Sequence, residues 1–161
     1  MNIVKWALAL AVGGFLLFFG FLKFSGNAHI FPFIEYNADR LGFPLSDLFF
    51  PLVNYATGLL ELVAGVLVIL PMTRKIGAPL AVAPFLGAFV FHLSPLLGVI
   101  TPNGYSESTP DGVTPLADAL SSGGPFVREH FTAETGPVLF ALAAVFLIVA
   151  IANAVVQRRE A

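Results

Sequence analysis

The stretch GLLELVAGVLVILP, residues 58–71, is apolar enough to lie inside a lipid bilayer, yet it carries the carboxylate of Glu61 near its middle. A charged side chain at the centre of a membrane helix costs at least about 2.5 kcal/mol, so such a residue usually has a partner or a function. The sequence on either side, residues 48–60 and 62–73, contains no charge. The stretch therefore predicts a membrane-spanning helix with a buried carboxylate.

The composition of the whole chain is that of a membrane protein. Of its 161 residues, 57% are hydrophobic and 11% are charged, whereas soluble domains carry about 25% charged residues. The sequence has no cysteine, which excludes thiolate nucleophiles, disulfide exchange and cysteine-ligated clusters. The formal net charge of −2 gives no reason to expect binding to nucleic acid.

Four apolar segments reach or approach the roughly 20 residues that span a bilayer. We expect spanning helices at about 3–24, 47–70, 76–99 and 135–157, with outer loops at 25–46 and 100–134. The first segment is longer than the apolar core of a signal peptide and lacks a small-residue cleavage site, so we expect it to be retained, with Trp6 as an interfacial anchor. The fold class predicted is an all-α membrane protein, a single domain built as an antiparallel four-helix transmembrane bundle with an outward-facing loop cap.

Local signals predict further detail at the ends of these spans. Pro84 predicts a kink in the third helix, and Ser46 is a plausible N-cap for the second. Apolar residues recur at helical spacing in 30–41, which indicates a short amphipathic helix lying in the interface. The segment 126–131 is flanked by aromatic residues and is expected to pack back on the bundle. The tip at 106–115 is expected to be the most mobile part of the chain.

The division of lysine and arginine predicts the orientation of the chain. Five such residues lie on one side of the predicted spans, namely Lys5, Arg74, Lys75, Arg158 and Arg159, and three lie on the other, namely Lys23, Arg40 and Arg128. Eight of the ten acidic residues fall on the second side. Both termini are therefore expected to be cytoplasmic, with the long loops facing outward.

Four polar residues of the spans are predicted to share one layer of the membrane. At a rise of about 1.5 Å per residue, Lys23, Asn54, Glu61 and His92 all lie roughly 20–30 Å from the cytoplasmic boundary. One interpretation is a structural ion pair between Lys23 and Glu61. The other is a buried pocket that opens outward, in which Glu61 binds a ligand or carries protons. Under either interpretation we expect Glu61 to contact Lys23 or His92, directly or through water.

The histidines and Arg128 are the remaining candidate site residues. His92 alone is typical of a hydrogen-bonded interior residue, and the three histidines have no metal-binding spacing, so no metal site is predicted. Arg128 and His130 are candidates in the outer loop, because they lie between apolar residues that can fold them into the cap.

Short motifs around this layer resemble the DoxX-like superfamily of small four-helix bacterial membrane proteins, and more closely its YkgB-like branch. The matching motifs are Gly20-Phe21-Leu22-Lys23-Phe24, Phe31-Pro32-Phe33-Ile34, Gly58 with Glu61 through Gly65, Leu93-Ser94 and Ile100-Thr101-Pro102. The resemblance covers about residues 20–102. Near residue 124 the family pattern has an arginine that this sequence lacks, although Arg128-Glu129 keeps a basic–acidic pair.

The resemblance implies a multi-pass protein of the bacterial inner membrane, and some relatives belong to quinone-linked sulfur oxidation or to oxidant resistance. The favoured role is a non-catalytic or accessory subunit that binds a lipid, a quinone or a partner complex. One alternative is a quinone-linked oxidoreductase subunit in which Glu61 and His92 relay protons. The other is a small proton-coupled transporter that works as an oligomer. No cofactor is predicted apart from a candidate quinone, and the expected partners are the bilayer, another membrane subunit or a second copy.

Overall fold

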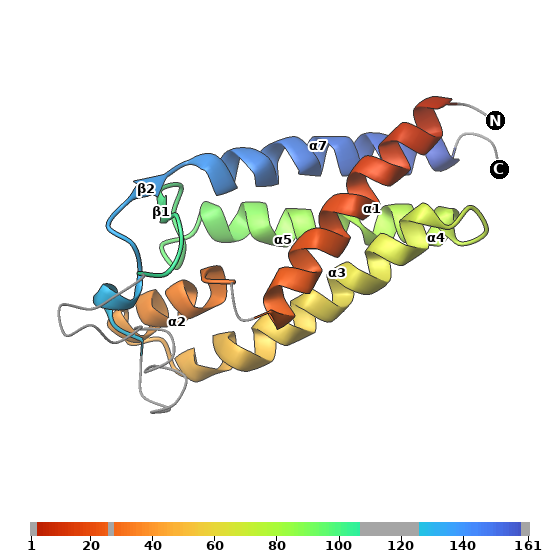
Figure 1. Ribbon diagram of the computed structural model, residues 1–161. Helices are drawn as coiled ribbons and strands as arrows, with labels where there is room; N and C mark the ends of the chain where they lie inside the picture. Colours follow the sequence, from red (N-terminus) through yellow and green to blue (C-terminus); the bar gives the residue numbers. More distant parts are fainter. Residues whose placement is uncertain (1–2, 26–27, 107–125, 159–161) are drawn as a thin grey trace.

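The structure is a computed structural model that describes residues 3–25, 28–106 and 126–158 (Figure 1). Its helices are α1 (Ile3–Phe24), α2 (Ile30–Arg40), α3 (Asn54–Ile69), α4 (Arg74–Leu80), α5 (Val82–His92) and α7 (Val138–Arg158). Three short helical turns are η1 (Ser46–Leu48), η2 (Phe49–Val53) and η3 (Arg128–His130), and β1 (Thr101–Pro102) pairs antiparallel with β2 (Thr135–Gly136).

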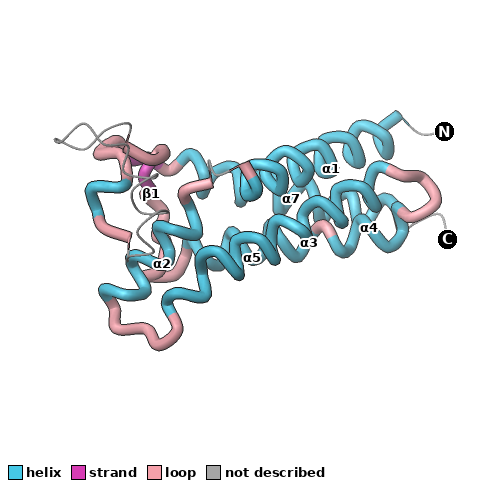
Figure 2. Tube along the Cα trace, turned by 60° about the horizontal axis from the view of Figure 1, so that its bottom comes forward, coloured by secondary structure: helices cyan, strands magenta, loops and turns pink. Residues whose placement is uncertain are grey.

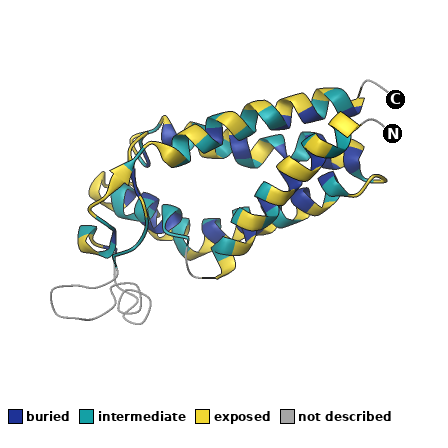
Figure 3. Cartoon of the chain, turned by 45° about the horizontal axis from the view of Figure 1, so that its top comes forward, coloured by how far each residue is buried: buried dark blue, intermediate teal, exposed yellow. Residues whose placement is uncertain are grey.

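Four helical runs are long and apolar enough to cross a membrane, namely Ile3–Phe24, Ser46–Ile69, Arg74–His92 and Val138–Arg158. Large apolar side chains such as Phe18, Leu59 and Ile148 are exposed on them. Exposed positions follow the outer faces of the long helices along their whole length (Figure 3). Such faces suit lipid rather than water. The predicted class of a mostly helical, multi-pass membrane protein is confirmed.

Helices α1 and α3 form the closest contact, which we call the glycine seam after Gly13 and Gly20 of α1 and Gly58 and Gly65 of α3. A Cβ atom added to Gly65 would lie 3.0 Å from the carbonyl oxygen of Gly13, and one added to Gly20 would lie 3.0 Å from that of Gly58. Small residues let helix backbones approach closely in lipid, where van der Waals packing drives association. The pairing of Gly13 with Gly65 and of Gly20 with Gly58 shows that the two helices are antiparallel.

The second helix pair is α5 with α7, and it meets the first pair near the chain termini, at what we call the terminal end. Both termini lie at this end (Figure 1). Here α4 packs on both α3 and α7, and α1 also contacts α7. The buried core at this end is made mostly of small side chains, including Ala9, Val12, Ala64, Ala78 and Ala150. Small side chains allow all the helices to meet closely, so the bundle is tightly closed here.

The opposite end, which we call the cap end, is covered by α2, the two strands and the helical turns (Figures 1 and 2). Phe31 and Ile34 of α2 pack with Leu97, and a second aromatic cluster forms around Phe126 and Phe131. The predicted amphipathic helix at 30–41 and the packing of 126–131 are therefore present in the structure. The tip expected to be mobile falls almost wholly within residues 107–125, outside the described residues.

The third span differs from its prediction at its far end. Regular α-helix is interrupted at Ala81, one turn before Pro84, because proline has no N–H to bond the carbonyl of Leu80; the interruption lies where a kink is predicted. The predicted end at residue 99 is wrong, since α5 ends at His92. Ser94 precedes Pro95, which disfavours helix, and its hydroxyl donates to the Phe91 carbonyl at 2.7 Å and accepts the Leu96 N–H at 3.2 Å.

The second span also begins less regularly than predicted. Ser46 does not cap it; its hydroxyl donates to Asp47 at 3.4 Å, and regular α-helix begins only at Asn54. Phe50, which precedes Pro51, has extended backbone angles of φ −134° and ψ 133°, as residues before proline prefer. The cap end of this span is therefore a series of turns rather than one straight helix.

The fourth span begins at Val138, and the predicted first turn at 135–137 is instead strand β2 followed by Pro137. At the terminal end, the ring of Trp6 lies 4.1 Å from the guanidinium of Arg74, which is itself only 6% exposed. Arg74 donates to the carbonyls of Val68 at 3.0 Å and Ile69 at 2.7 Å. Arg74 thus caps the last turn of α3, a packing role that charge counting could not reveal.

Candidate ligand cavity

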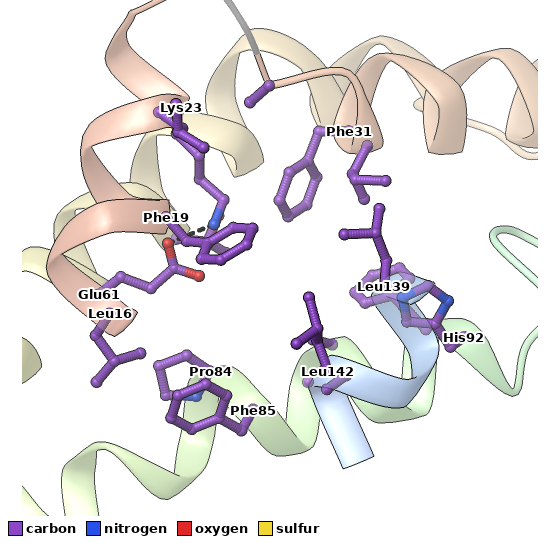
Figure 4. Close-up of a pocket in the computed structure, with 18 of the residues that line it drawn as sticks. Leu16, Phe19, Lys23, Phe31, Glu61, Pro84, Phe85, His92, Leu139 and Leu142 are labelled. Atoms are coloured by element: carbon purple, nitrogen blue, oxygen red, sulfur yellow. Dashed lines mark hydrogen bonds and ion pairs between the residues drawn. The ribbon is translucent and has the colours of Figure 1, made fainter. Parts of the chain in front are cut away.

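A cavity of about 300 Å³ lies between the α1–α3 pair and the α5–α7 pair, beneath α2. It exists because the two pairs contact closely at the terminal end and only slightly between α3 and α5. Its walls are mostly apolar and aromatic, and the lining includes Phe15, Phe19, Phe31, Phe85, Phe91, Leu139 and Leu142 (Figure 4). The volume lies at the lower end of the range for small-molecule sites, which is about 300–1,000 Å³.

Lys23 and Glu61 form an ion pair on the α1–α3 wall of this cavity (Figure 4). The Lys23 ammonium donates to Oε2 of Glu61, and each side chain is 12% exposed. The same ammonium lies 5.8 Å from the centre of the Phe31 ring, which brings α2 against the pair. The contact that the sequence predicts between Glu61 and Lys23 is present, and it joins the two helices of the glycine seam.

Asn54 lies in the contact between α1 and α3, outside the cavity, where it hydrogen-bonds to the backbone of Lys23. Its side-chain nitrogen donates to the backbone carbonyl of Lys23 at 3.1 Å, and the residue is completely buried. It does not belong to the cavity lining, so its prediction as a direct ligand-binding candidate is not favoured by the geometry. Its Oδ1 is buried and has no hydrogen-bond partner among the described residues.

His92 lines the opposite, α5 side of the cavity and is 4% exposed. In Figure 4 it lies across the cavity from Glu61, so the structure does not show the two in contact. Its Nδ1 donates to the Gly98 carbonyl at 2.7 Å, because a carbonyl can only accept. In the neutral ring this leaves Nε2 as an acceptor, and in the described part of the chain Nε2 has no hydrogen-bond partner.

His29 and Thr57 also line the cavity, although the sequence did not point to either residue as part of this site. Nε2 of His29 donates to the Pro102 carbonyl at 2.9 Å, and the Tyr105 hydroxyl donates to the Ala28 carbonyl at 3.0 Å. These bonds tie the start of α2 to the loop after α5 and close the cap end of the cavity. Only the chain topology brings these residues together, so no local motif could have indicated them.

Arg128 and His130 stay in the cap, away from the cavity lining. Arg128 donates to the carbonyls of Phe131 at 3.0 Å and Thr132 at 3.2 Å, and Nδ1 of His130 accepts the Val127 N–H at 3.1 Å. The structure therefore assigns both residues to loop structure. Three residues of the predicted polar layer thus line the two cavity walls and Asn54 supports them, whereas the two outer-loop candidates lie in the cap.

Glu35 is a half-buried carboxyl group, located on α2 outside the spans. Its Oε2 accepts the backbone N–H of Phe50 at 3.0 Å, which fastens α2 to η2. Burial raises the pKa of Glu35 from 4.5 to about 7, and the nearby Asp47 and Asp39 add to the rise, while the bond from Phe50 opposes it. Glu35 is adjacent in sequence to Ile34, which lines the cavity, so this titratable group belongs to the helix that covers the site.

The described lining residues can supply binding, hydrogen bonding and proton exchange. The wall near α1 and α3 carries one ammonium and one carboxylate, whose charges compensate each other. The other lining residues are apolar apart from His29, His92 and Thr57. Within the described residues, no group of three or more His, Asp or Glu side chains is placed to hold a metal ion.

Comparison of the chain with protein-family models, with curated proteins and with solved structures found no match. The resemblance to the DoxX-like superfamily thus stays a prediction from short motifs.

Proposed function

We propose that this chain binds a small amphiphile of the bilayer, a lipid or a quinone, in the cavity between its helix pairs, and acts as a non-catalytic or accessory membrane subunit. The observation that carries the proposal is the cavity of about 300 Å³ with a buried ion pair on one wall and apolar rings elsewhere. Ligand sites in proteins are mostly apolar, with a few placed polar groups that orient the ligand.

The fold assigned with this function is an antiparallel four-helix bundle in the bacterial inner membrane, with the cap end outward. The motif resemblance to DoxX-like proteins supports this location, and the excess of lysine and arginine at the terminal end supports cytoplasmic termini. The exposed apolar faces of the helices are in contact with lipid or with another membrane subunit.

The orientation can be tested because the chain has no native cysteine. Arg40 at the cap end and Met72 at the terminal end are both exposed, so each can be replaced by a single cysteine. On intact cells, a membrane-impermeant thiol reagent should label Arg40→Cys, while Met72→Cys should react only after lysis. The reverse pattern would overturn the proposed orientation.

The binding function is tested by filling the cavity. Gly87 lines it, and a Cβ atom placed on Gly87 would meet no atom within 4 Å, so Gly87→Leu puts a side chain into the open space. Gly14 on α1 is equally uncrowded but exposed and outside the lining, which makes Gly14→Leu a matched control.

Each variant is purified from membranes, and bound molecules are identified by mass spectrometry of the extract. One amphiphile should co-purify in stoichiometric amount with the wild type and with Gly14→Leu, and should be lost from Gly87→Leu. Equal amounts of every extracted lipid in all three preparations would contradict the proposal. A quinone present in the wild-type and Gly14→Leu extracts and absent from the Gly87→Leu extract would identify the candidate cofactor.

A further inference from the structure

We propose that the amphiphile carries a neutral aromatic ring with a hydroxyl group, a phenol-type head, which binds at the Lys23–Glu61 pair. This inference rests on the proposed function and names the chemistry of its ligand. It follows from three features of the cavity: its ring-lined walls, the charge balance of the ion pair, and the hydrogen-bonding positions that the pair leaves open.

The walls favour a flat ring. Phenylalanine side chains enter the cavity from α1, α2 and α5, and Phe31 and Phe91 meet edge to face with ring centres 6.4 Å apart. Aromatic rings prefer such edge-to-face or offset contacts, which are worth about 0.5–1.5 kcal/mol beyond burial. A dry cavity of about 150 Å³ accommodates benzene, and this cavity is about 300 Å³, which leaves room for a ring with substituents.

The charge balance favours a neutral head. The carboxylate of Glu61 is already compensated by the ammonium of Lys23, and both side chains are largely buried. A phosphate or carboxylate head would add a buried charge without its own partner, at a cost of several kcal/mol. Among the described lining residues, Lys23 is the one lysine or arginine, so the cavity does not offer a second cation for an anionic head.

The hydrogen-bonding positions favour a hydroxyl group over an ether or a carbonyl group. One oxygen of Glu61 is paired with Lys23, and the other has no hydrogen-bond partner among the described residues and is turned toward the cavity interior (Figure 4). That oxygen can only accept, whereas the ammonium of Lys23 can only donate. A hydroxyl group both donates and accepts, so it can bond to both members of the pair. An ether or ketone oxygen can satisfy only Lys23.

The test compares three probes of nearly equal shape on the protein in lipid nanodiscs. 4-Methylphenol offers a hydroxyl donor, 4-methylanisole offers an oxygen that only accepts, and toluene offers neither. Binding is measured by saturation-transfer NMR titration, with empty nanodiscs subtracted to remove partition into lipid. A hydrogen bond to a charged group is worth about 1.5–3 kcal/mol, so 4-methylphenol should bind at least about tenfold more tightly than the other two probes.

Variants locate the effect. Glu61→Gln keeps the shape of the side chain and a neutral acceptor but removes the charge, so it should reduce the preference for 4-methylphenol over 4-methylanisole to well below tenfold. The double variant Lys23→Met, Glu61→Leu removes the whole pair and serves if Glu61→Gln does not fold. Gly87→Leu should abolish binding of all three probes, whereas Gly14→Leu should bind like the wild type.

The two proposals fail in different ways. Equal affinity of the three probes, all lost in Gly87→Leu, would overturn the phenol-type head but leave a ring-binding cavity. A tenfold preference that survives in both the Glu61→Gln and the double variant would also overturn it, since the hydroxyl would then bind elsewhere. Absence of any binding above empty nanodiscs would overturn both this inference and the proposed function.

Discussion

Gly65 on α3 and Gly87 on α5 lie in two regions of the molecule where helices face each other at different spacing. In the glycine seam, a Cβ atom on Gly65 would lie 2.9 Å from Leu17 and 3.0 Å from the Gly13 carbonyl. Between the helix pairs, a Cβ atom on Gly87 would meet no atom within 4 Å. The same residue type therefore permits close packing in one region and leaves open space in the other.

The difference shows how one bundle combines a rigid wall with a binding site. The seam holds α1 and α3 at a fixed separation and carries the Lys23–Glu61 pair at its edge. The α5–α7 pair meets this wall at the small residues of the terminal end and at the stacked rings of Phe15 and Phe146, so space remains nearer the cap. The ion pair lies at the boundary between the two regions.

The largest expected effect on stability comes from removing one partner of the Lys23–Glu61 ion pair. Lys23→Met leaves the Glu61 carboxylate buried without its cation, which should destabilise the protein by about 3–5 kcal/mol. The double variant Lys23→Met, Glu61→Leu should recover most of this loss, because replacing a whole buried pair with apolar residues is often neutral. Unfolding of both variants by denaturant in detergent measures the difference. A double variant as unstable as the single one would show that the pair does more than balance charge.

The next largest expected effect is the loss of stability when a side chain is added to the glycine seam. Gly65→Ala forces the seam apart, and overpacking of this kind costs about 1–3 kcal/mol. The control is Gly14→Ala on the exposed face of α1, which should be neutral or slightly stabilising, since alanine favours helix by up to about 1 kcal/mol. Thermal unfolding in detergent compares them. Equal stability of the two variants would mean that the seam can relax without cost.

The spans and the ion pair could be predicted from the sequence, whereas the cavity could not. Long uncharged runs identify helices in a membrane, and a carboxylate as isolated as Glu61 requires a partner, which predicts a contact with Lys23 or His92. A cavity depends on where helices diverge, and the sequence around Gly87 does not indicate whether another helix packs against it. The burial of Arg74 and the end of α5 at His92 likewise depend on neighbouring carbonyls and on the turn at Ser94.

A smaller effect concerns the cover of the cavity and its dependence on pH. The pKa of Glu35 is raised to about 7 in the folded protein against an ordinary value of 4.5, so the folded state binds the proton more tightly. Stability should therefore fall as pH rises from about 4.5 to 7. Solvent screening at this half-buried site keeps the change below about 1 kcal/mol.

Glu35→Gln keeps a hydrogen-bond acceptor for Phe50 but removes the titration. Stability measured from pH 4.5 to 8 should show a smaller decline in this variant than in the wild type. Identical pH profiles for the two proteins would place the pKa of Glu35 near its ordinary value and remove the pH dependence from α2.

The smallest expected effect is on the stability of the cavity-filling variant. Gly87→Leu meets no neighbouring atom at its Cβ position, so its free energy of unfolding should differ from that of Gly14→Leu by less than about 0.5 kcal/mol. Denaturant titration of the two variants checks this. A strongly destabilised Gly87→Leu would mean that the helix pairs close on the space in the absence of ligand.

The glycine seam has a consequence for the order in which the chain is made. Gly13 and its partner Gly65 are 52 positions apart in the sequence, and Glu61 follows Lys23 by 38. At about 5–20 residues per second, α1 is complete several seconds before its partner helix is synthesised. Throughout that delay the glycine face of α1 contacts lipid, and the ammonium of Lys23 has to be solvated by water or headgroups until its carboxylate arrives.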